Sequence, residues 1–327
     1  MESHTSTNNQ LHSLTPMRGI AALWVVLYHY AVWYFPAIEP GRYSHLLDKG
    51  YLAVDMFFML SGFVMTHVYW RAFVKEGGNH YWAFLSARIA RLYPLHLFVL
   101  VLFLAIAVAF RGFQYVATGR FDAIPMEGAR SLSALLANLF MLQGLKASEL
   151  SWNYPAWSIS VEFIAYLAFP FMLPSIWRAS TPVKVALAGV VVAALSLFSW
   201  LTGNNFDQWD GPQTLLRCLP EFLLGTLLYA AFKSDVGAAF LRRDATVVTT
   251  TVVALALLHL GAADLFAILC FPVLILAAVS NDGYVAKLVN IAPLVWLGEV
   301  SYSLYLIHGF VEYTTTKFID AAGLGGP

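Results

Sequence analysis

Charged residues are scarce in this chain. Only 12% of the 327 residues are Asp, Glu, Lys or Arg, whereas 59% are hydrophobic. Soluble domains carry about 25% charged and about 45–50% apolar residues. A large soluble enzyme is excluded, because its core would not produce repeated apolar runs long enough to cross a bilayer. The composition predicts an all-α fold, a polytopic membrane helix bundle.

An excess of positive charge, a pattern of paired cysteines and a cleavable leader are also missing. Lys and Arg number 19, as do Asp and Glu, so nothing indicates a nucleic acid partner. Cys218 and Cys270 fall within apolar stretches and predict neither a disulfide nor a metal site. No basic residue precedes Arg18 and no small-residue cleavage site follows the first apolar run, so we expect the first span to remain in the mature protein. Without repeats or a soluble domain, we expect one transmembrane domain over residues 1–327, with its core at about 14–318.

Apolar runs of spanning length define the predicted organisation. A stretch of fifteen residues, 131–145, is shorter and predicts a short span, a re-entrant segment or an interfacial helix. The basic residues between 71 and 91 place that loop, and therefore the N-terminus, in the cytoplasm. Nine spans satisfy the positive-inside rule better than ten, and both counts stay open. The clear spans are expected at about 14–35, 51–70, 92–110, 156–177, 183–201, 214–232, 245–261, 264–280 and 294–318.

The first span contains two groups that membrane helices rarely carry, Arg18 and His29. They are eleven residues apart, which is close to a whole number of helical turns, so they share one face about 16 Å apart along the axis. We expect Arg18 near the cytoplasmic interface, where it can hold an anionic ligand, and His29 deep in the membrane as a proton acceptor. The alternative for His29 is a structural hydrogen bond to a neighbouring helix.

An R-x-x-R pair, Arg88 and Arg91, precedes the third predicted span. Residues three apart on a helix are neighbours, and guanidinium groups suit phosphate oxygens. The alternative is that both arginines only satisfy the positive-inside rule and contact lipid headgroups.

Two carboxylates lie within predicted spans. Asp55 is near the start of the second span, where it caps the helix, pairs with Arg18 or orients the imidazole of His29. Glu162 follows two tryptophans and needs a buried partner, for which Arg18 and His29 are candidates.

Three further polar positions have weaker signals. Ser61 precedes Gly62 and indicates close helix packing, since no G-x-S-x-G elbow surrounds it. Tyr302 and His308 lie in the last span, and structural hydrogen bonding is the first interpretation for His308.

Five stretches, taken in order, resemble the acyltransferase-3 family of integral membrane acyltransferases. They cover the chain from Arg18 to His308, and the ordered set is more specific than any one of them. The stretches are R-x10-H within MRGIAALWVVLYH, D-x-F-F-x-L-S-G-F from Asp55, R-x-x-R-L-Y-P from Arg88, W-S-x-S-V-E ending at Glu162, and S-Y-S-L-Y-L-I-H ending at His308.

The resemblance implies transfer of an acyl group, commonly acetyl, from cytoplasmic acyl-CoA to a hydroxyl of a glycan or lipid-linked sugar. Acyl-CoA would be a donor substrate and not a permanently bound cofactor, and the bilayer would be that of the bacterial cytoplasmic membrane. His29 would accept the hydroxyl proton. The predicted catalytic set is His29, Arg18, Asp55 and Glu162; the predicted acyl-CoA ligands are Arg18, Arg88 and Arg91, and the supporting residues are Ser61, Tyr302 and His308.

The chain departs from some relatives in two respects. We expect no appended extracytoplasmic hydrolase-like domain, so the chain resembles the shorter members that modify exopolysaccharide, lipid-linked glycans or small glycosides. Phe163 follows Glu162 where many relatives have a second glutamate, which argues against a paired carboxylate there. Direct transfer and a transient acyl-His29 both remain open. A transporter that uses Arg18 and His29 for binding or proton coupling, and a scaffold of an export complex, are the alternative functions.

Overall fold

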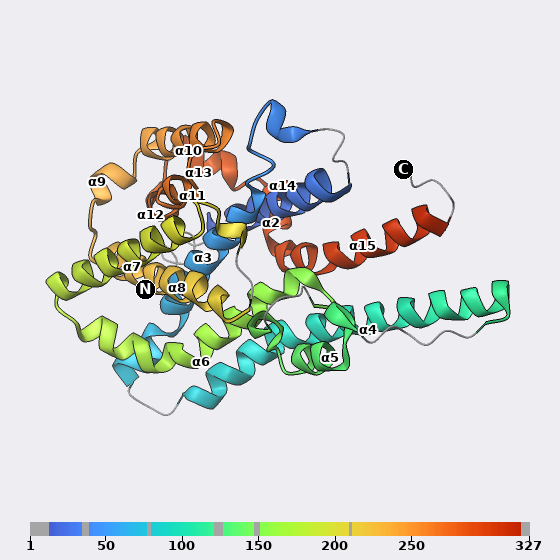
Figure 1. Cartoon of the computed structure of the whole chain (residues 1–327). Helices are drawn as coiled ribbons and strands as arrows, with labels where there is room; N and C mark the ends of the chain where they lie inside the picture. The colour runs from blue at the N-terminus through green and yellow to red at the C-terminus, as the bar shows by residue number, and fades with distance from the viewer. Residues whose placement is uncertain are drawn as a thin grey trace.

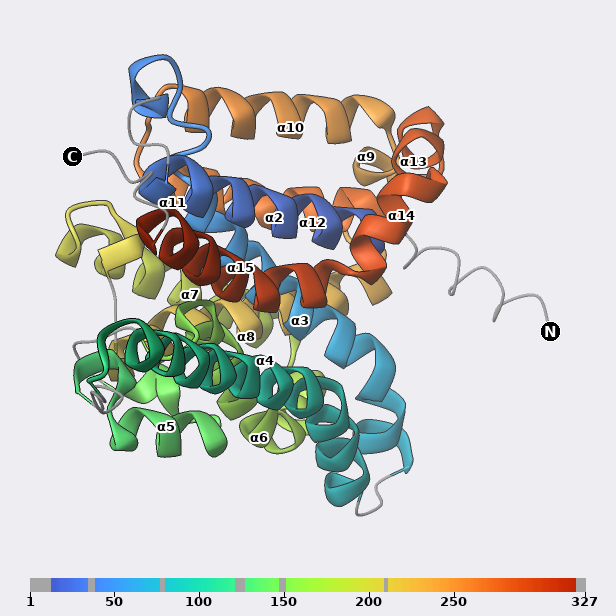
Figure 2. The ribbon, with the colours of Figure 1, turned by 90° about the vertical axis from the view of Figure 1, so that its right-hand side faces the viewer.

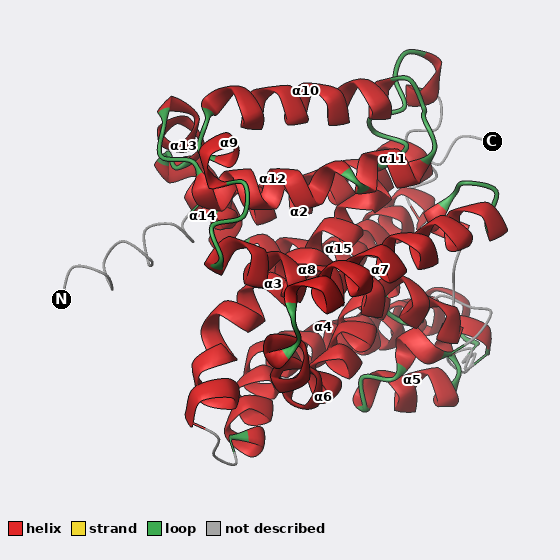
Figure 3. Cartoon of the chain, turned by 90° about the vertical axis from the view of Figure 1, so that its left-hand side faces the viewer, coloured by secondary structure: helices red, strands yellow, loops and turns green. Residues whose placement is uncertain are grey.

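The computed structural model describes residues 13–34, 39–76, 80–120, 127–146, 151–208 and 211–321. All regular structure in these ranges is helical (Figures 1 and 3). The α-helices are α2 (Leu14–His29), α3 (Ala53–Trp70), α4 (Tyr81–Thr118), α5 (Leu132–Leu139), α6 (Trp157–Arg178), α7 (Thr181–Leu201), α8 (Thr214–Lys233), α9 (Ala238–Leu241), α10 (Asp244–His259), α11 (Asp264–Ile268), α12 (Cys270–Ser280), α13 (Tyr284–Val289), α14 (Ala292–Glu299) and α15 (Ser301–Ala321).

Several of these helices are long and apolar enough to cross a membrane. Five helices are each long and apolar enough on their own. They are α4, α6, α7 and the longer helical segments Gly50–Glu76 and Gly211–Lys233, which include α3 and α8. The bent pair α14 and α15 makes a sixth if it is counted as one span. The apolar helices α10 and α11–α12 are shorter, and α2 continues into a π-helical turn at Tyr30–Tyr34. Figure 2 shows α2, α12 and α15 stacked between α10 on one side and α4 on the other. The protein is an integral membrane protein with an all-α polytopic bundle.

The ambiguous stretch 131–145 does not form a long helix. It contains the eight-residue α5, which is about 12 Å long and cannot cross a hydrocarbon core of about 30 Å. The Ser131 side chain caps this helix by accepting a hydrogen bond from the Ala134 N–H at 3.2 Å. By length and composition five of the described helices can cross a membrane, or six with the bent pair, so the nine-span and ten-span alternatives both stay open.

Two predicted spans have different limits in the structure. The third span was expected to begin at residue 92, but α4 begins at Tyr81 and runs for 38 residues, so Arg88 and Arg91 lie inside the helix. The last span was expected to be continuous over 294–318, but α14 and α15 meet at an angle of 63°. The Ser301 hydroxyl stabilises the break by donating to the Gly298 carbonyl at 2.7 Å.

Glycines allow the closest contacts between helices. A Cβ atom on Gly62 of α3 would lie 2.0 Å from the Phe222 carbonyl oxygen, and one on Gly225 of α8 would lie 2.0 Å from that of Met59. The backbones of α3 and α8 therefore touch, as membrane helices do where small residues meet. Gly62 thus has the packing role that its sequence context indicated.

Candidate active site

Arg18, Arg88 and Arg91 converge on one cavity of about 380 Å³, here called the arginine cavity. Arg18 comes from the second turn of α2, and the other two come from α4. The three arginines converge because α4 begins early, at Tyr81, so that the R-x-x-R pair lies within the helix. The two arginines share the face of α4 that is directed toward α2 and α15. The other polar lining residues are Ser61, Ser158, Glu162, Tyr166, Ser301, Tyr302 and Tyr305.

The three guanidinium groups are only partly engaged by protein acceptors. Arg88 donates to the Tyr69 hydroxyl at 3.1 Å, and Arg91 lies over the Tyr302 ring at 5.9 Å from its centroid. Within the described part of the chain, Arg18 and Arg91 donate no side-chain hydrogen bond. Their N–H groups are therefore available to an anion in the cavity, and bidentate contacts to phosphate oxygens are the strongest that guanidinium groups make.

A chain of hydroxyl groups leads to Glu162 along the wall of this cavity. The Tyr166 hydroxyl donates to Glu162 Oε1 at 2.5 Å, so the Ser61 hydroxyl, 2.8 Å away, donates to the Tyr166 oxygen. Glu162 therefore has Tyr166 as its hydrogen-bond partner and forms no ion pair with Arg18 or His29 among the described residues. It still lines the cavity that contains Arg18. Ser61, Tyr302 and Glu162 belong to the wall of the arginine cavity.

His29 lies at the far end of α2 from Arg18. Its Nδ1 is 2.8 Å from the Val25 carbonyl oxygen. A carbonyl only accepts, so Nδ1 carries the proton and Nε2 is the basic nitrogen of the neutral ring. The His29 ring packs against Tyr28, Tyr154 and His308, with centroid distances of 4.7, 4.9 and 5.0 Å.

His308 and Glu312 reach the same place from α15. His308 is 2% exposed, and its Nδ1 lies 2.5 Å from the Tyr305 carbonyl oxygen. The Tyr154 hydroxyl donates to the buried Glu312 carboxylate, and the Tyr154 ring packs on both histidines. Sequence reasoning missed Tyr154 and Glu312. An acidic residue in an apolar helix, one turn after His308, was the available signal for Glu312.

Tyr305 connects the arginine cavity to the histidines. It lines the cavity, and its ring centroid is 5.8 Å from that of His308. Its hydroxyl lies 2.9 Å from the Pro155 carbonyl and 2.7 Å from the Ser158 hydroxyl, which fixes the ring. A molecule in the arginine cavity would therefore meet Tyr305 before His308 and His29.

A second cavity, here called the aspartate cavity, lies at the opposite end of α2. It has a volume of about 490 Å³ and contains Tyr28, whose hydroxyl donates to Asp207 Oδ2 at 2.8 Å. Desolvation raises the pKa of the Asp207 carboxyl, and the Tyr28 hydrogen bond opposes this shift. The other polar lining residues are Glu39, Arg42, Asp48, Tyr51 and Asn205.

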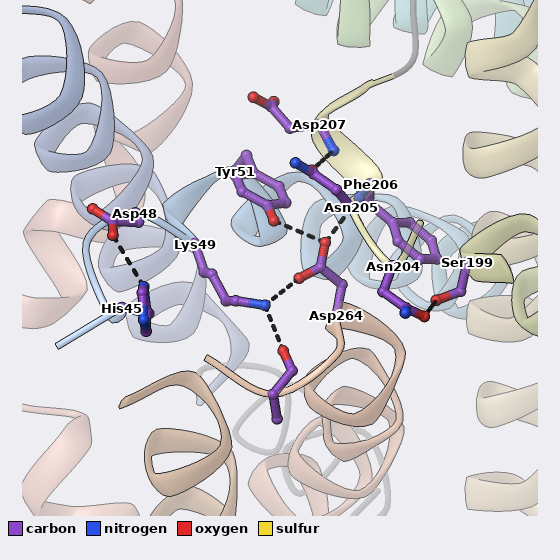
Figure 4. A network of polar contacts seen from close by, with 11 residues as sticks. His45, Asp48, Lys49, Tyr51, Ser199, Asn204, Asn205, Phe206, Asp207 and Asp264 are labelled. Atoms are coloured by element: carbon purple, nitrogen blue, oxygen red, sulfur yellow. Dashed lines mark hydrogen bonds and ion pairs between the residues drawn. The ribbon is translucent and has the colours of Figure 1, made fainter. Parts of the chain in front are cut away.

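Buried Asp264 holds the walls of the aspartate cavity in place (Figure 4). Its carboxylate accepts hydrogen bonds from Lys49 Nζ at 2.6 Å, from the Tyr51 hydroxyl at 2.8 Å and from the Phe206 N–H at 2.8 Å. These donors come from the loops before α3 and before α8, so one carboxylate joins the two loops that carry the cavity residues. These three hydrogen bonds fix the two loops relative to one another.

Comparisons with known proteins identify the family of the chain. The model of the acyltransferase domain family matches residues 11–326. The chain belongs to the acyltransferase-3 family. Acyltransferase MdmB of Streptomyces mycarofaciens is 26% identical over 92% of this chain and 79% of its own length. O-acetyltransferase OatA of Staphylococcus aureus is 26% identical over 91% of this chain, which spans 50% of that relative.

Two further comparisons add detail. Protein 2 in the picA locus of Rhizobium radiobacter is 42% identical over 28% of this chain and 43% of its own length. No solved structure matches the chain. The family and its acyltransferase relatives establish the protein as an acyltransferase that transfers groups other than aminoacyl groups.

In this acyltransferase-3 protein, one predicted site residue has a different partner from those expected. Asp55 is fully buried, and its two oxygens accept hydrogen bonds from Arg217 at 2.7 and 2.6 Å. Arg217 is 2% exposed and also donates to the carbonyls of Phe206 and Tyr51. Asp55 therefore neither pairs with Arg18 nor hydrogen-bonds His29 here; it joins α3 to α8. Arg217, which sequence reasoning missed, is a buried cation within a span and carried the same signal as Arg18.

No cluster in the described part of this acyltransferase suits a metal ion, since no three His, Cys, Asp or Glu side chains come together there. Cys218 and Cys270 are both free thiols.

Proposed function

We propose that this protein is an O-acetyltransferase of the bacterial cytoplasmic membrane that moves an acetyl group from cytoplasmic acetyl-CoA to a hydroxyl of a glycan or lipid-linked sugar. The observation that carries the proposal is the convergence of Arg18, Arg88 and Arg91 on one cavity. Tyr305 also lines this cavity, and its ring lies beside that of His308. The relative OatA is an O-acetyltransferase, which supports acetyl as the transferred group.

The arginine cavity suits the donor. Phosphate groups of CoA carry several negative charges, and three guanidinium groups at one cytoplasmic cavity provide matching donors. A pantetheine arm is narrow and largely apolar, as is the lining that Val54, Phe57 and Phe58 contribute. With the phosphates on the arginines, the arm extends along α2 and brings the thioester toward Tyr305 and the histidines.

The acceptor would approach from the aspartate cavity. Tyr28 lines that cavity and packs against His29, so a hydroxyl group bound there lies on the acceptor side of the imidazole. His29 Nε2 takes the hydroxyl proton as the oxygen attacks the thioester carbon. The new C–O bond forms, the C–S bond breaks, and the proton ends on the thiol of CoA. A general base of this kind contributes about 10²–10⁴-fold to the rate.

Radiolabelled acetyl-CoA tests the proposal directly. Membranes from cells that express the wild type or His29→Ala are incubated with the label, and acetate released from the glycan fraction by mild alkali is counted. His96→Ala is the matched control, because His96 is also a histidine within a long helix but bonds the Asn138 carbonyl, away from both cavities. We expect labelling by the wild type and His96→Ala and at least a hundredfold less by His29→Ala. Equal labelling by all three would make His29 structural, and no labelling by the wild type would refute the donor or the reaction.

A further inference from the structure

Two histidines, and not one, lie between the two cavities. His308 packs against Tyr305, which lines the arginine cavity, and His29 packs against Tyr28, which lines the aspartate cavity. The two imidazole rings are 5.0 Å apart and inclined at 36°. Each ring is therefore in contact with a residue that lines a different cavity.

The hydrogen bonds of His308 leave one nitrogen for chemistry. Its Nδ1 donates to the Tyr305 carbonyl, so in the neutral ring Nε2 is unprotonated. That nitrogen is buried and has no hydrogen-bond partner among the described residues. Buried polar atoms without partners are rare in folded proteins and need an explanation. His96 Nδ1 is also buried without a partner among the described residues, so what distinguishes the open nitrogen of His308 is its place, in a ring 5.0 Å from that of His29.

A buried carboxylate stands beside the histidine pair. Glu312 accepts the hydroxyl of Tyr154, whose ring lies 4.9 Å from His29 and 5.7 Å from His308. Glu312 is 3% exposed and forms no ion pair within the described part of the chain. An imidazolium that forms transiently in this apolar region gains from a nearby negative charge. Tyr154 thus links the Glu312 carboxylate to the histidine pair.

We propose that His308 is the catalytic acid for the donor, and that the proton taken by His29 from the acceptor passes to His308 Nε2 and then to the departing thiolate of CoA. The proposal rests on the proposed function, because it divides that reaction between two rings. The acceptor oxygen bonds to the acyl carbon, the C–S bond breaks with its electron pair on sulfur, and the hydroxyl proton ends on that sulfur. No oxidant, reductant or net proton is required. Glu312 and Tyr154 are positioning residues for the charge.

The experiment compares two acetyl donors with the same membranes. Acetyl-CoA releases an alkylthiolate that needs a proton, whereas p-nitrothiophenyl acetate releases a thiolate stable enough to leave without one. Transfer of radiolabelled acetyl to the glycan fraction is measured for the wild type, His308→Gln, His308→Asn, His29→Gln and His96→Gln. The ratio of the two rates is taken for each variant, so the amount of folded protein cancels.

We expect both His308 variants to lose about a hundredfold with acetyl-CoA and to stay within about threefold of the wild type with p-nitrothiophenyl acetate. His29→Gln should lose activity with both donors, and His96→Gln with neither. The assignment would be overturned if the two His308 variants, His308→Gln and His308→Asn, lost the same share of transfer activity with both donors, or lost none with either donor. Both outcomes would leave the proposed function intact. Failure of the wild type to use acetyl-CoA would instead refute the proposed function.

Discussion

Replacing Asp55 by Asn tests whether this carboxylate has a structural or a catalytic role. The substitution keeps the shape but removes the charge that two Arg217 contacts, at 2.7 and 2.6 Å, depend on. It also places an amide N–H opposite a guanidinium N–H. The Arg217 side chain is 2% exposed, so water cannot replace the lost partner, and the buried Glu221 is the carboxyl group that remains near it. Removing one member of a buried ion pair costs about 3–5 kcal/mol, and we expect Asp55→Asn to lose stability by that amount.

The assay is thermal unfolding in detergent, with transfer activity measured per folded molecule. A loss of this size lowers the apparent Tm by at least several degrees. The double variant Asp55→Leu/Arg217→Met should regain part of the loss, but not all, because the carbonyls of Tyr51 and Phe206 lose a donor. Asp235→Asn is the control, since that carboxylate is 80% exposed beside Arg242 and its ion pair contributes little. An Asp55→Asn protein that melts with the wild type but transfers a hundredfold more slowly would refute the structural role.

Three further predictions concern packing, donor binding and the histidine pair. Gly225→Ala places a methyl group 2.0 Å from the Met59 carbonyl oxygen and should cost about 1–3 kcal/mol in thermal unfolding, whereas Gly189→Ala meets no atom within 4 Å and should not. Arg91→Gln should raise the KM for acetyl-CoA about 10–100-fold but not that for acetylpantetheine, which lacks the nucleotide phosphates; an equal rise for both would contradict phosphate binding. Glu312→Gln keeps a partner for Tyr154 but removes the charge, so kcat should fall about tenfold with KM unchanged; a normal kcat would exclude an electrostatic role.

The membrane helices and the polar residues within them are predictable from local chemistry, because a bilayer penalises charge wherever it occurs in a span. This reasoning singled out Arg18, His29 and Glu162. In the described bundle Arg18 and Glu162 line the same cavity. The same reasoning applied to TLLRCLPE would have selected Arg217. Its partner Asp55 is 162 residues away, and no local pattern predicts a contact between spans at that separation.

The end of the chain shows how helix spacing and a backbone break together create the site. Had residues 294–318 formed one straight helix, α15 would follow the direction of α14, which packs through Gly298 against Thr15 of α2. The 63° bend at Val300 turns α15 so that one face runs from the arginine cavity to the histidines. The polar residues on this face follow one another at intervals of three, three and four positions. From the first to the last, the helix rises by about 15 Å, which matches the distance of about 16 Å between Arg18 and His29 along α2. Donor contacts and proton chemistry are thus aligned on two neighbouring helices, and the residues of α15 that do this are Tyr302, Tyr305, His308 and Glu312.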